Sequence, residues 1–282
     1  MEAKIMNNVP ESIVIIEPKK GLFQLDLKGI WQHRELLYFL VWRDLKVRYK
    51  QTIIGIGWAV LQPLISMIIF TLIFGELAKI PSDGLPYSIF VYSALLPWNY
   101  FASALQRCVA SVVGDASLIS KVYFPRLILP LASTVSGLTD FLASLVLLLG
   151  MMAYYGIGVS WSVLMLPLFL VLAVSTALAV GLWLSALNVR YRDVGYTIPF
   201  IVQIWMYASP IVYPVSMIPQ KYRFFYSLNP MAGVIEGFRW ALLGKQSPVF
   251  SVMAISAAVV LLLVTGGVIF FRNMEKTFAD VV

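Results

Sequence analysis

The sequence has 282 residues, of which 60% are hydrophobic and only 12% are charged, and its mean hydropathy is +0.84. Soluble domains carry roughly twice that share of charged residues, so the composition indicates a polytopic membrane protein. The formal net charge of +7 does not call for a nucleic-acid partner, because membrane proteins collect lysine and arginine on their cytoplasmic side. One cysteine and one histidine exclude an intramolecular disulfide and argue against a metal or haem site built by this chain.

The N-terminal region divides into two parts. Residues 1–30 are polar and irregular and predict a loosely packed cytoplasmic tail, without a cleavable signal peptide, since the first long apolar run begins near Ile53. Residues 31–50 predict an amphipathic helix lying in the membrane interface, with aromatic residues on one face and cations away from it. Such a helix is either a plain topology anchor or the lining of an entrance for an amphipathic, lipid-linked substrate with an anionic head. The candidate residues are Arg34, Tyr38, Trp42, Arg43, Lys46 and Lys50.

Six apolar segments are long enough to cross a membrane, since about 20 apolar residues span the ~30 Å hydrocarbon core. They form a membrane domain over residues 51–272, followed by a C-terminal segment over 273–282. The predicted spans cover about 53–75, 86–106, 127–154, 161–187, 195–217 and 249–271. With the N-terminus inside, 16 of the 21 lysines and arginines fall in cytoplasmic segments. This bias predicts that both termini are cytoplasmic.

Residues 114–126, between the second and third predicted spans, are too polar for lipid and too long for a tight turn. The charge bias places them in the cytoplasm. Their apolar side chains fall at helical spacing, which predicts a short amphipathic helix with one apolar face. This face consists of Leu118, Ile119, Val122 and Tyr123. A helix held between two spans in this way indicates a docking surface.

Polar and aromatic residues also fall near the middle of predicted spans. The aromatic ones are either tightly packed or line a path, and flat rings would suit a glycan. The group consists of Trp98, Asn99, Tyr100, Trp205 and Tyr207. Asp140 falls near the middle of the third span, where a charge is costly. No lysine or arginine lies inside a predicted span, so we expect Asp140 to be protonated, or hydrogen-bonded to Ser136, Thr139 or a neighbouring helix.

Residues 217–247 form the only long segment on the predicted outer side. Asn229 is a good N-cap with a proline directly after it, and Gly244 predicts the end of that helix. The apolar residues between them favour two short helices that dip into the outer leaflet, and an ordinary interfacial loop is the alternative. Glu236 and Arg239 have the spacing of a pair along one helix.

The chain contains no phosphate-binding loop, nucleophile elbow or H-E-x-x-H motif, so we expect it not to be an enzyme.

In combination, several motifs resemble the permease subunit of bacterial ABC polysaccharide exporters, a family that exports O-antigen, teichoic acid and capsule chains. The motifs are LISKVYFPR at 118–126 followed by LP at 129–130, LKVRYKQT at 45–52 leading into GIGW at 55–58 and LQP at 61–63, NVRYRD at 188–193 and NPM at 229–231. The resemblance covers about residues 31–275.

This resemblance implies an all-α permease of six transmembrane helices in the bacterial cytoplasmic (inner) membrane. It would form a homodimer that exports a lipid-linked polysaccharide along the dimer interface, and its partners would include membrane lipids but no nucleic acid. It would bind two copies of a separate ATPase that holds ATP and Mg²⁺, while this chain would carry no cofactor or metal. Spans one, two and five would line the channel, and residues 31–50 would be a gate helix.

The resemblance also implies roles for individual residues. Residues 114–126 would be the coupling helix on the ATPase, with contacts from Leu118, Ile119, Lys121, Tyr123, Phe124 and Arg126. The five mid-span residues named above would line the channel. The external segment would close the outer mouth through Phe225, Asn229, Glu236 and Arg239.

Three other functions remain open. An ABC exporter of a small lipophilic compound predicts a narrower path with few aromatic residues. A proton- or ion-coupled transporter or channel using Asp140 predicts paired intramembrane charges and, usually, inverted repeats, and we find neither in the sequence. A membrane glycosyltransferase or polymerase requires an acidic catalytic cluster at the interface, which the sequence lacks.

Overall fold

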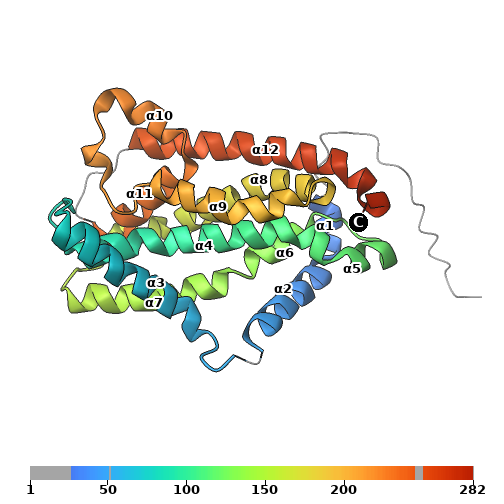
Figure 1. The fold of residues 1–282 in the computed structure, drawn as a ribbon, viewed down its shortest axis with the longest axis horizontal. Helices are drawn as coiled ribbons and strands as arrows, with labels where there is room; N and C mark the ends of the chain where they lie inside the picture. The colour runs from blue at the N-terminus through green and yellow to red at the C-terminus, as the bar shows by residue number, and fades with distance from the viewer. Residues whose placement is uncertain (1–26, 51, 245–249, 282) are drawn as a thin grey trace, which may run out of the picture.

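The computed structural model describes residues 27–50, 52–244 and 250–281, and the regular elements within these ranges are all helical. The helices form an elongated bundle (Figure 1). One end of the bundle holds α1, α5 and the end of α12, and the other end holds α10 and α11. Most of the predicted N-terminal tail lies outside the described residues.

The predicted helix over residues 31–50 is divided at His33 into two helices, α1 and α2. In chain order the elements are α1 (Leu27–Gln32), α2 (Arg34–Tyr49), α3 (Gly57–Phe70), the π-helix η1 (Thr71–Leu77), α4 (Tyr87–Gly114), α5 (Ala116–Lys121), α6 (Ile128–Val135), α7 (Leu138–Tyr154), the 3₁₀-helix η2 (Trp161–Met165), α8 (Leu166–Arg190), α9 (Asp193–Tyr207), the 3₁₀-helices η3 (Val215–Met217) and η4 (Gln220–Tyr222), α10 (Arg223–Ser227), α11 (Pro230–Leu243) and α12 (Phe250–Val281).

Four helical segments in the described part of the chain are long and apolar enough to cross a membrane. They are Gly57–Leu77, Ile128–Tyr154, Trp161–Arg190 and Phe250–Phe278, and they coincide with the first, third, fourth and sixth predicted spans. The second and fifth predicted spans correspond to α4 and α9, of 28 and 15 residues, and these two stay predictions.

α4 forms the centre of the bundle. Most of its side chains are buried, and it packs against α3, α6, α7, α8 and α11. The largest fully buried side chains include Phe90, Tyr92 and Phe101 from this one helix. Because protein rather than lipid surrounds α4, its sequence can include more polar residues than a lipid-facing span. Its contacts stabilise the fold chiefly through close packing, since lipid tails are as apolar as leucine.

α8 and α12 lie in close contact over the halves that run toward the α5 end of the bundle. A Cβ added at Gly266 would come within 2.8 Å of the Trp183 ring, and one at Gly267 within 3.0 Å of it. The Trp183 ring stacks on Phe270 with centroids 4.8 Å apart, and its Nε1 donates to the carbonyl of Leu263 at 3.1 Å. The two glycines therefore allow α8 and α12 to pack closely around Trp183.

α12 is longer than a membrane span requires. Its 32 residues extend about 48 Å at 1.5 Å per residue, well beyond the ~30 Å hydrocarbon core. Its last turns pack Phe271 and Phe278, both fully buried, into the cluster that contains Ile119 and Phe124. α12 thus supports the segment predicted to be the coupling helix.

Candidate functional site

The predicted coupling helix is short, and only part of its apolar face is buried. α5 ends at Lys121, because Val122 has extended backbone angles (φ −131°, ψ 135°). Ile119 is buried, whereas Val122 and Tyr123 are 50% and 82% exposed. The prediction that these residues share one apolar helical face is therefore wrong beyond Lys121. Beyond the helix, Tyr123 is exposed and Phe124 is buried, so these two adjacent side chains lie on opposite sides of the segment.

Two surfaces follow from this geometry. We call residues 121–123, which are all exposed, the exposed corner. The inner side consists of Ile119 and Phe124, with Leu118 half-buried beside them. Arg126 fixes this inner side to α12, because its backbone N–H donates to Glu275 Oε1 at 3.1 Å and its guanidinium donates to the Glu275 carbonyl.

An ion pair joins α2 to the start of α5. The Arg43 guanidinium donates to both carboxylate oxygens of Asp115, at 2.6 and 2.8 Å. Asp115 directly precedes α5, and its hydrogen bonds raise the pKa of Arg43. Because Arg43 is 44% exposed, the pair contributes at most about 1 kcal/mol to stability in water, and its main effect is positional. It links the predicted gate helix to the predicted coupling helix.

A second ion pair joins the end of α2 to α7. Arg48 Nη1 lies 2.6 Å from Asp140 Oδ2, and the Tyr49 hydroxyl donates to the other carboxylate oxygen. Arg48 also donates to Ser136 at 3.2 Å, and Thr139 Oγ1 lies 3.3 Å from Asp140. Burial, and then the bond to Asp140, raise the pKa of Tyr49, which keeps its hydroxyl protonated. The predicted hydrogen bonds of Asp140 to Thr139 and to a neighbouring helix are formed. Asp140 also has a cationic partner that was not predicted, because α2 brings Arg48 to the α6–α7 junction.

Arg107 lies close enough to this pair to interact electrostatically with both members. It was missed as a candidate, since in the sequence it contributes only to the charge bias. It donates from Nε to the carbonyl of Ser133 at 3.3 Å, while its buried Nη2 has no hydrogen-bond partner within the described residues. A side chain at Gly137 would collide with this guanidinium. The packing explains why glycine occupies the junction between α6 and α7.

The other predicted gate-helix residues lie on the open face of α2. α2 packs on α6 through Leu40, which is 5% exposed, and its opposite face is uncovered. The Lys46 ammonium lies 5.5 Å from the centroid of Trp42, and Arg34 lies over Trp31 in the same way. The exposed residues are Arg34, Tyr38, Trp42, Lys46 and Lys50. Their placement in a membrane interface stays a prediction.

The predicted channel residues differ widely in exposure. Trp98 and Tyr100 are only 2% and 3% exposed and pack inside the chain. Trp205 and Asn99 are half-buried, and Tyr207 is 55% exposed. Within one copy of the chain, therefore, Asn99, Trp205 and Tyr207 are accessible, whereas Trp98 and Tyr100 are not.

Two rows of accessible side chains were missed in the sequence. On α4, Asn99, Ser103 and Gln106 recur at helical spacing and are all at least partly exposed; we call them the polar strip. On α9, four exposed side chains at positions i, i+4, i+7 and i+11 form what we call the aromatic stripe: Tyr196, Phe200, Gln203 and Tyr207. α4 and α9 are in contact, with the Phe101 and Trp205 rings 5.0 Å apart. The spacing itself was the signal that could have identified both rows.

The helix α11, in the predicted external segment, begins after Asn229 and ends at Gly244, as predicted. Asn229 is its N-cap and accepts a hydrogen bond from the Met231 backbone at 3.0 Å, and Gly244 ends it with a left-handed φ of +62°. Asn229 Oδ1 also accepts from Trp205 Nε1 at 2.8 Å. One side chain therefore fixes the start of α11 to the end of α9.

The predicted pair between Glu236 and Arg239 is not formed in the described structure, and that prediction is wrong. Arg239 instead donates to the carbonyl of Ile211 at 2.8 Å and lies 3.6 Å from the centroid of Phe90. Both charged residues are buried, at 5% and 6% exposure. Of the predicted external gate only Phe225, on α10, is widely exposed, at 69%.

Residues 35–243 match the membrane-domain family of ABC-2 type transporters. The chain belongs to this family. It is 28% identical to the O-antigen export system permease protein RfbA of Myxococcus xanthus over 90% of this chain and 98% of that protein. The protein of the same name from Klebsiella pneumoniae is 28% identical over 88% of this chain and 95% of its own length. The polysialic acid transport protein KpsM of Escherichia coli is 22% identical, over 71% and 78% respectively.

In this ABC-2 transporter chain, the family match includes both ion pairs of α2, the whole of α5 and α11 up to Leu243. α12, which supports the coupling segment through Glu275, lies beyond the matched range. Among the described residues, no group of three or more histidine, cysteine or acidic side chains is placed to hold a metal ion.

Proposed function

We propose that this chain is the membrane subunit of an ATP-driven exporter that moves a lipid-linked polysaccharide across the bacterial cytoplasmic membrane. The observation that carries the proposal is the likeness to the relatives named for O-antigen export and polysialic acid transport, which extends over most of each chain. In this proposal α4 and α9 complete a set of six spans, and both termini are cytoplasmic.

The energy would come from a separate ATPase, because the chain itself has no phosphate-binding loop. The exposed corner supports this part of the proposal, since it presents Lys121 and an 82% exposed Tyr123 at one end of the bundle (Figure 1). Two copies of the chain would bind two copies of the ATPase, which holds ATP and Mg²⁺.

The polysaccharide would pass along the wall formed by the polar strip and the aromatic stripe, with a second copy opposite. Sugar rings stack on aromatic faces and bond to amides, and these two rows offer both kinds of side chain. Asn99 and Gln106 form no side-chain hydrogen bond with other described residues, so their amides are available to a glycan. α11 would close the outer mouth of this path.

Closure of the ATPase dimer on ATP would displace α5, and the Arg43–Asp115 pair would transmit that displacement to α2 at the entrance. ATP can drive such a change only to the extent that it binds one conformation more tightly than the other. Repeated cycles would then move the chain of sugars in steps.

Deletion of the gene in its own bacterium tests the function. We expect loss of a surface polysaccharide and accumulation of its lipid-linked form in the cytoplasmic membrane, measured by immunoblotting of surface glycan and mass spectrometry of extracted lipids. Complementation with the wild-type gene should restore both. Normal surface glycan in the deletion strain would reject the proposal. Transport that stops with a protonophore at unchanged ATP would instead support a transporter using Asp140.

The path along α4 and α9 makes its own prediction. Replacing Tyr207 with alanine should reduce export by about tenfold, because loss of one aromatic contact of ~1.4 kcal/mol weakens binding of the sugar by that factor. Export is measured as surface glycan per copy of folded chain. The matched control is Tyr154→Ala, which removes a tyrosine of 84% exposure at the end of α7. Equal export by both variants would remove Tyr207 from the path.

A further inference from the structure

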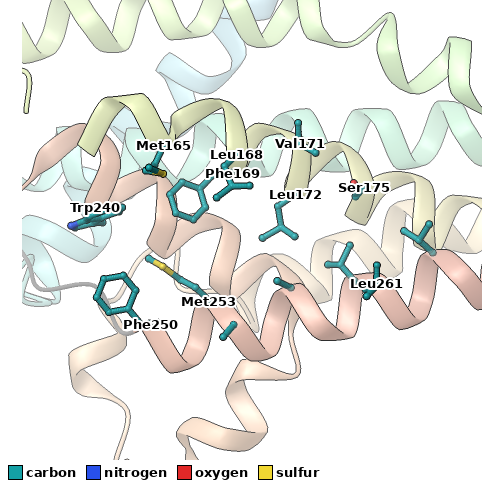
Figure 2. A pocket seen from close by; sticks show the side chains of 14 residues that line it. Met165, Leu168, Phe169, Val171, Leu172, Ser175, Trp240, Phe250, Met253 and Leu261 are labelled. Carbon is teal, nitrogen blue, oxygen red and sulfur yellow. The ribbon is translucent and has the colours of Figure 1, made fainter. Parts of the chain in front are cut away.

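An apolar groove of about 700 Å³ lies on the surface of the bundle between α8 and α12, with α11 at one end (Figure 2). Of its 14 lining residues, only Ser175 is not hydrophobic. The groove is open, since Leu168 and Leu261 on its two walls are 61% and 68% exposed. In a bilayer, an open apolar hollow of this size is accessible to the acyl chains of lipids.

The packing of three helices explains why the groove exists. α8 and α12 are locked together around Trp183 in one half and are separated by α11 in the other. Gly237 and Gly233 of α11 approach α8 and α12 so closely that a Cβ would collide with either helix. Where the helices part, two of the α12 residues that line the groove are Ala254 and Ala257, and these small side chains leave space that a larger residue would fill.

The groove faces hydrocarbon, because α8 and α12 belong to two of the four membrane-spanning segments. Its wall on α8 runs from Met165 to Ser175, a rise of about 15 Å, which is half of the ~30 Å hydrocarbon core. Trp240 and Phe250 stand at its outer end with ring centroids 6.1 Å apart, and Trp161 nearby is 87% exposed, as in an interfacial aromatic belt. The groove therefore has the length and depth of one leaflet.

We propose that this groove binds one acyl chain of a membrane phospholipid from the leaflet on the α11 side. The bound acyl chain would stabilise the position of α11 between α8 and α12. The lipid carrier of a substrate is a less suitable occupant, since the groove is remote from α2 and α3 across the bundle (Figure 1). A second copy is also less suitable, because the wall proposed to face it is built by α4 and α9. Both of these comparisons rest on the proposed function.

Photo-crosslinking tests the groove directly. The purified full chain is placed in nanodiscs of phosphatidylethanolamine and phosphatidylglycerol that contain a phosphatidylethanolamine with a diazirine in its acyl chain. After illumination, mass spectrometry should locate label on residues 168–172 and 254–261 at about ten times the level on Val146 of α7, which is 69% exposed. Ala257→Phe fills the groove and should abolish this excess, while Ala258→Phe, exposed on the same helix outside the groove, should not.

Three outcomes would overturn the inference. Label equal to that on Val146 would indicate only general lipid contact. Loss of the label on adding polyprenyl phosphate would assign the groove to the lipid carrier, and crosslinks between copies at Ala257 would assign it to a second copy.

If Ala257→Phe does not fold, Leu261→Trp fills the groove from an exposed position. As an independent measure, phospholipid added in detergent should raise the thermal midpoint of the wild type and of Ala258→Phe, but not of a groove-filling variant.

Discussion

Replacing Tyr123 with alanine should release the ATPase from the complex while the chain stays folded. Tyr123 is 82% exposed and lies between the extended Val122 and the buried Phe124, so it can act as an aromatic anchor without contributing to the core. Loss of such an anchor costs about 2 kcal/mol or more, which weakens binding roughly 30-fold. The measurement is the dissociation constant between the purified chain and the ATPase, together with the thermal midpoint of the chain.

Two further variants make this result interpretable. Trp161→Ala removes an aromatic residue of 87% exposure at the opposite end of the bundle and should leave ATPase binding unchanged. Phe124→Leu alters the buried side of the same segment, so it should lower the thermal midpoint more than Tyr123→Ala does. An unchanged dissociation constant for Tyr123→Ala would show that the ATPase docks elsewhere.

Removing the cation from the second ion pair should have the largest effect on stability. Arg48→Met leaves the Asp140 carboxylate without its ion-pair partner. Both side chains are 22% exposed, so breaking this partly buried pair costs up to about 3 kcal/mol. At roughly 2–4 °C per kcal/mol, the thermal midpoint should fall by up to about 6–12 °C. Asp140→Asn in the same chain should recover most of this loss, because a neutral amide no longer needs the cation.

The control for this cycle is Lys46→Met, which removes an exposed cation from the same helix and should shift the midpoint little. If Arg48→Met is as stable as the wild type, or if Asp140→Asn gives no recovery, the two residues do not stabilise one another. An exporter role for α2 also requires that Arg48→Met reduces transport per folded copy.

Local rules in the sequence were sufficient for some elements. The start of α11 at Asn229 and Pro230 and its end at Gly244 follow from capping preferences that act within one helical turn. The end of α5 could have been placed better, because Pro125 disfavours helical backbone at Phe124 and the segment therefore leaves the helix before it. The apolar pattern alone extended the helix too far.

Long-range contacts were beyond this kind of reasoning. Arg43 and Asp115 are 72 residues apart in sequence, and Arg48 and Asp140 are 92 apart, so only the folded arrangement brings them together. α4 is not among the segments that its hydropathy marks as a span, and a helix surrounded by protein can include polar residues that a lipid-facing helix does not tolerate. Equally, composition does not reveal that Trp98 is enclosed within one chain while Tyr207 is not.

The contact between α12 and the coupling segment has a consequence for biosynthesis. Glu275 and Phe278 support Arg126 and Phe124, yet the ribosome makes them after the rest of the helices in the described structure. A nascent chain, or one whose last helix has failed to insert, exposes α5 without its support. On the proposed function, the order of translation would delay a competent docking surface until insertion is complete, which would keep unfinished copies from engaging an ATPase and consuming ATP.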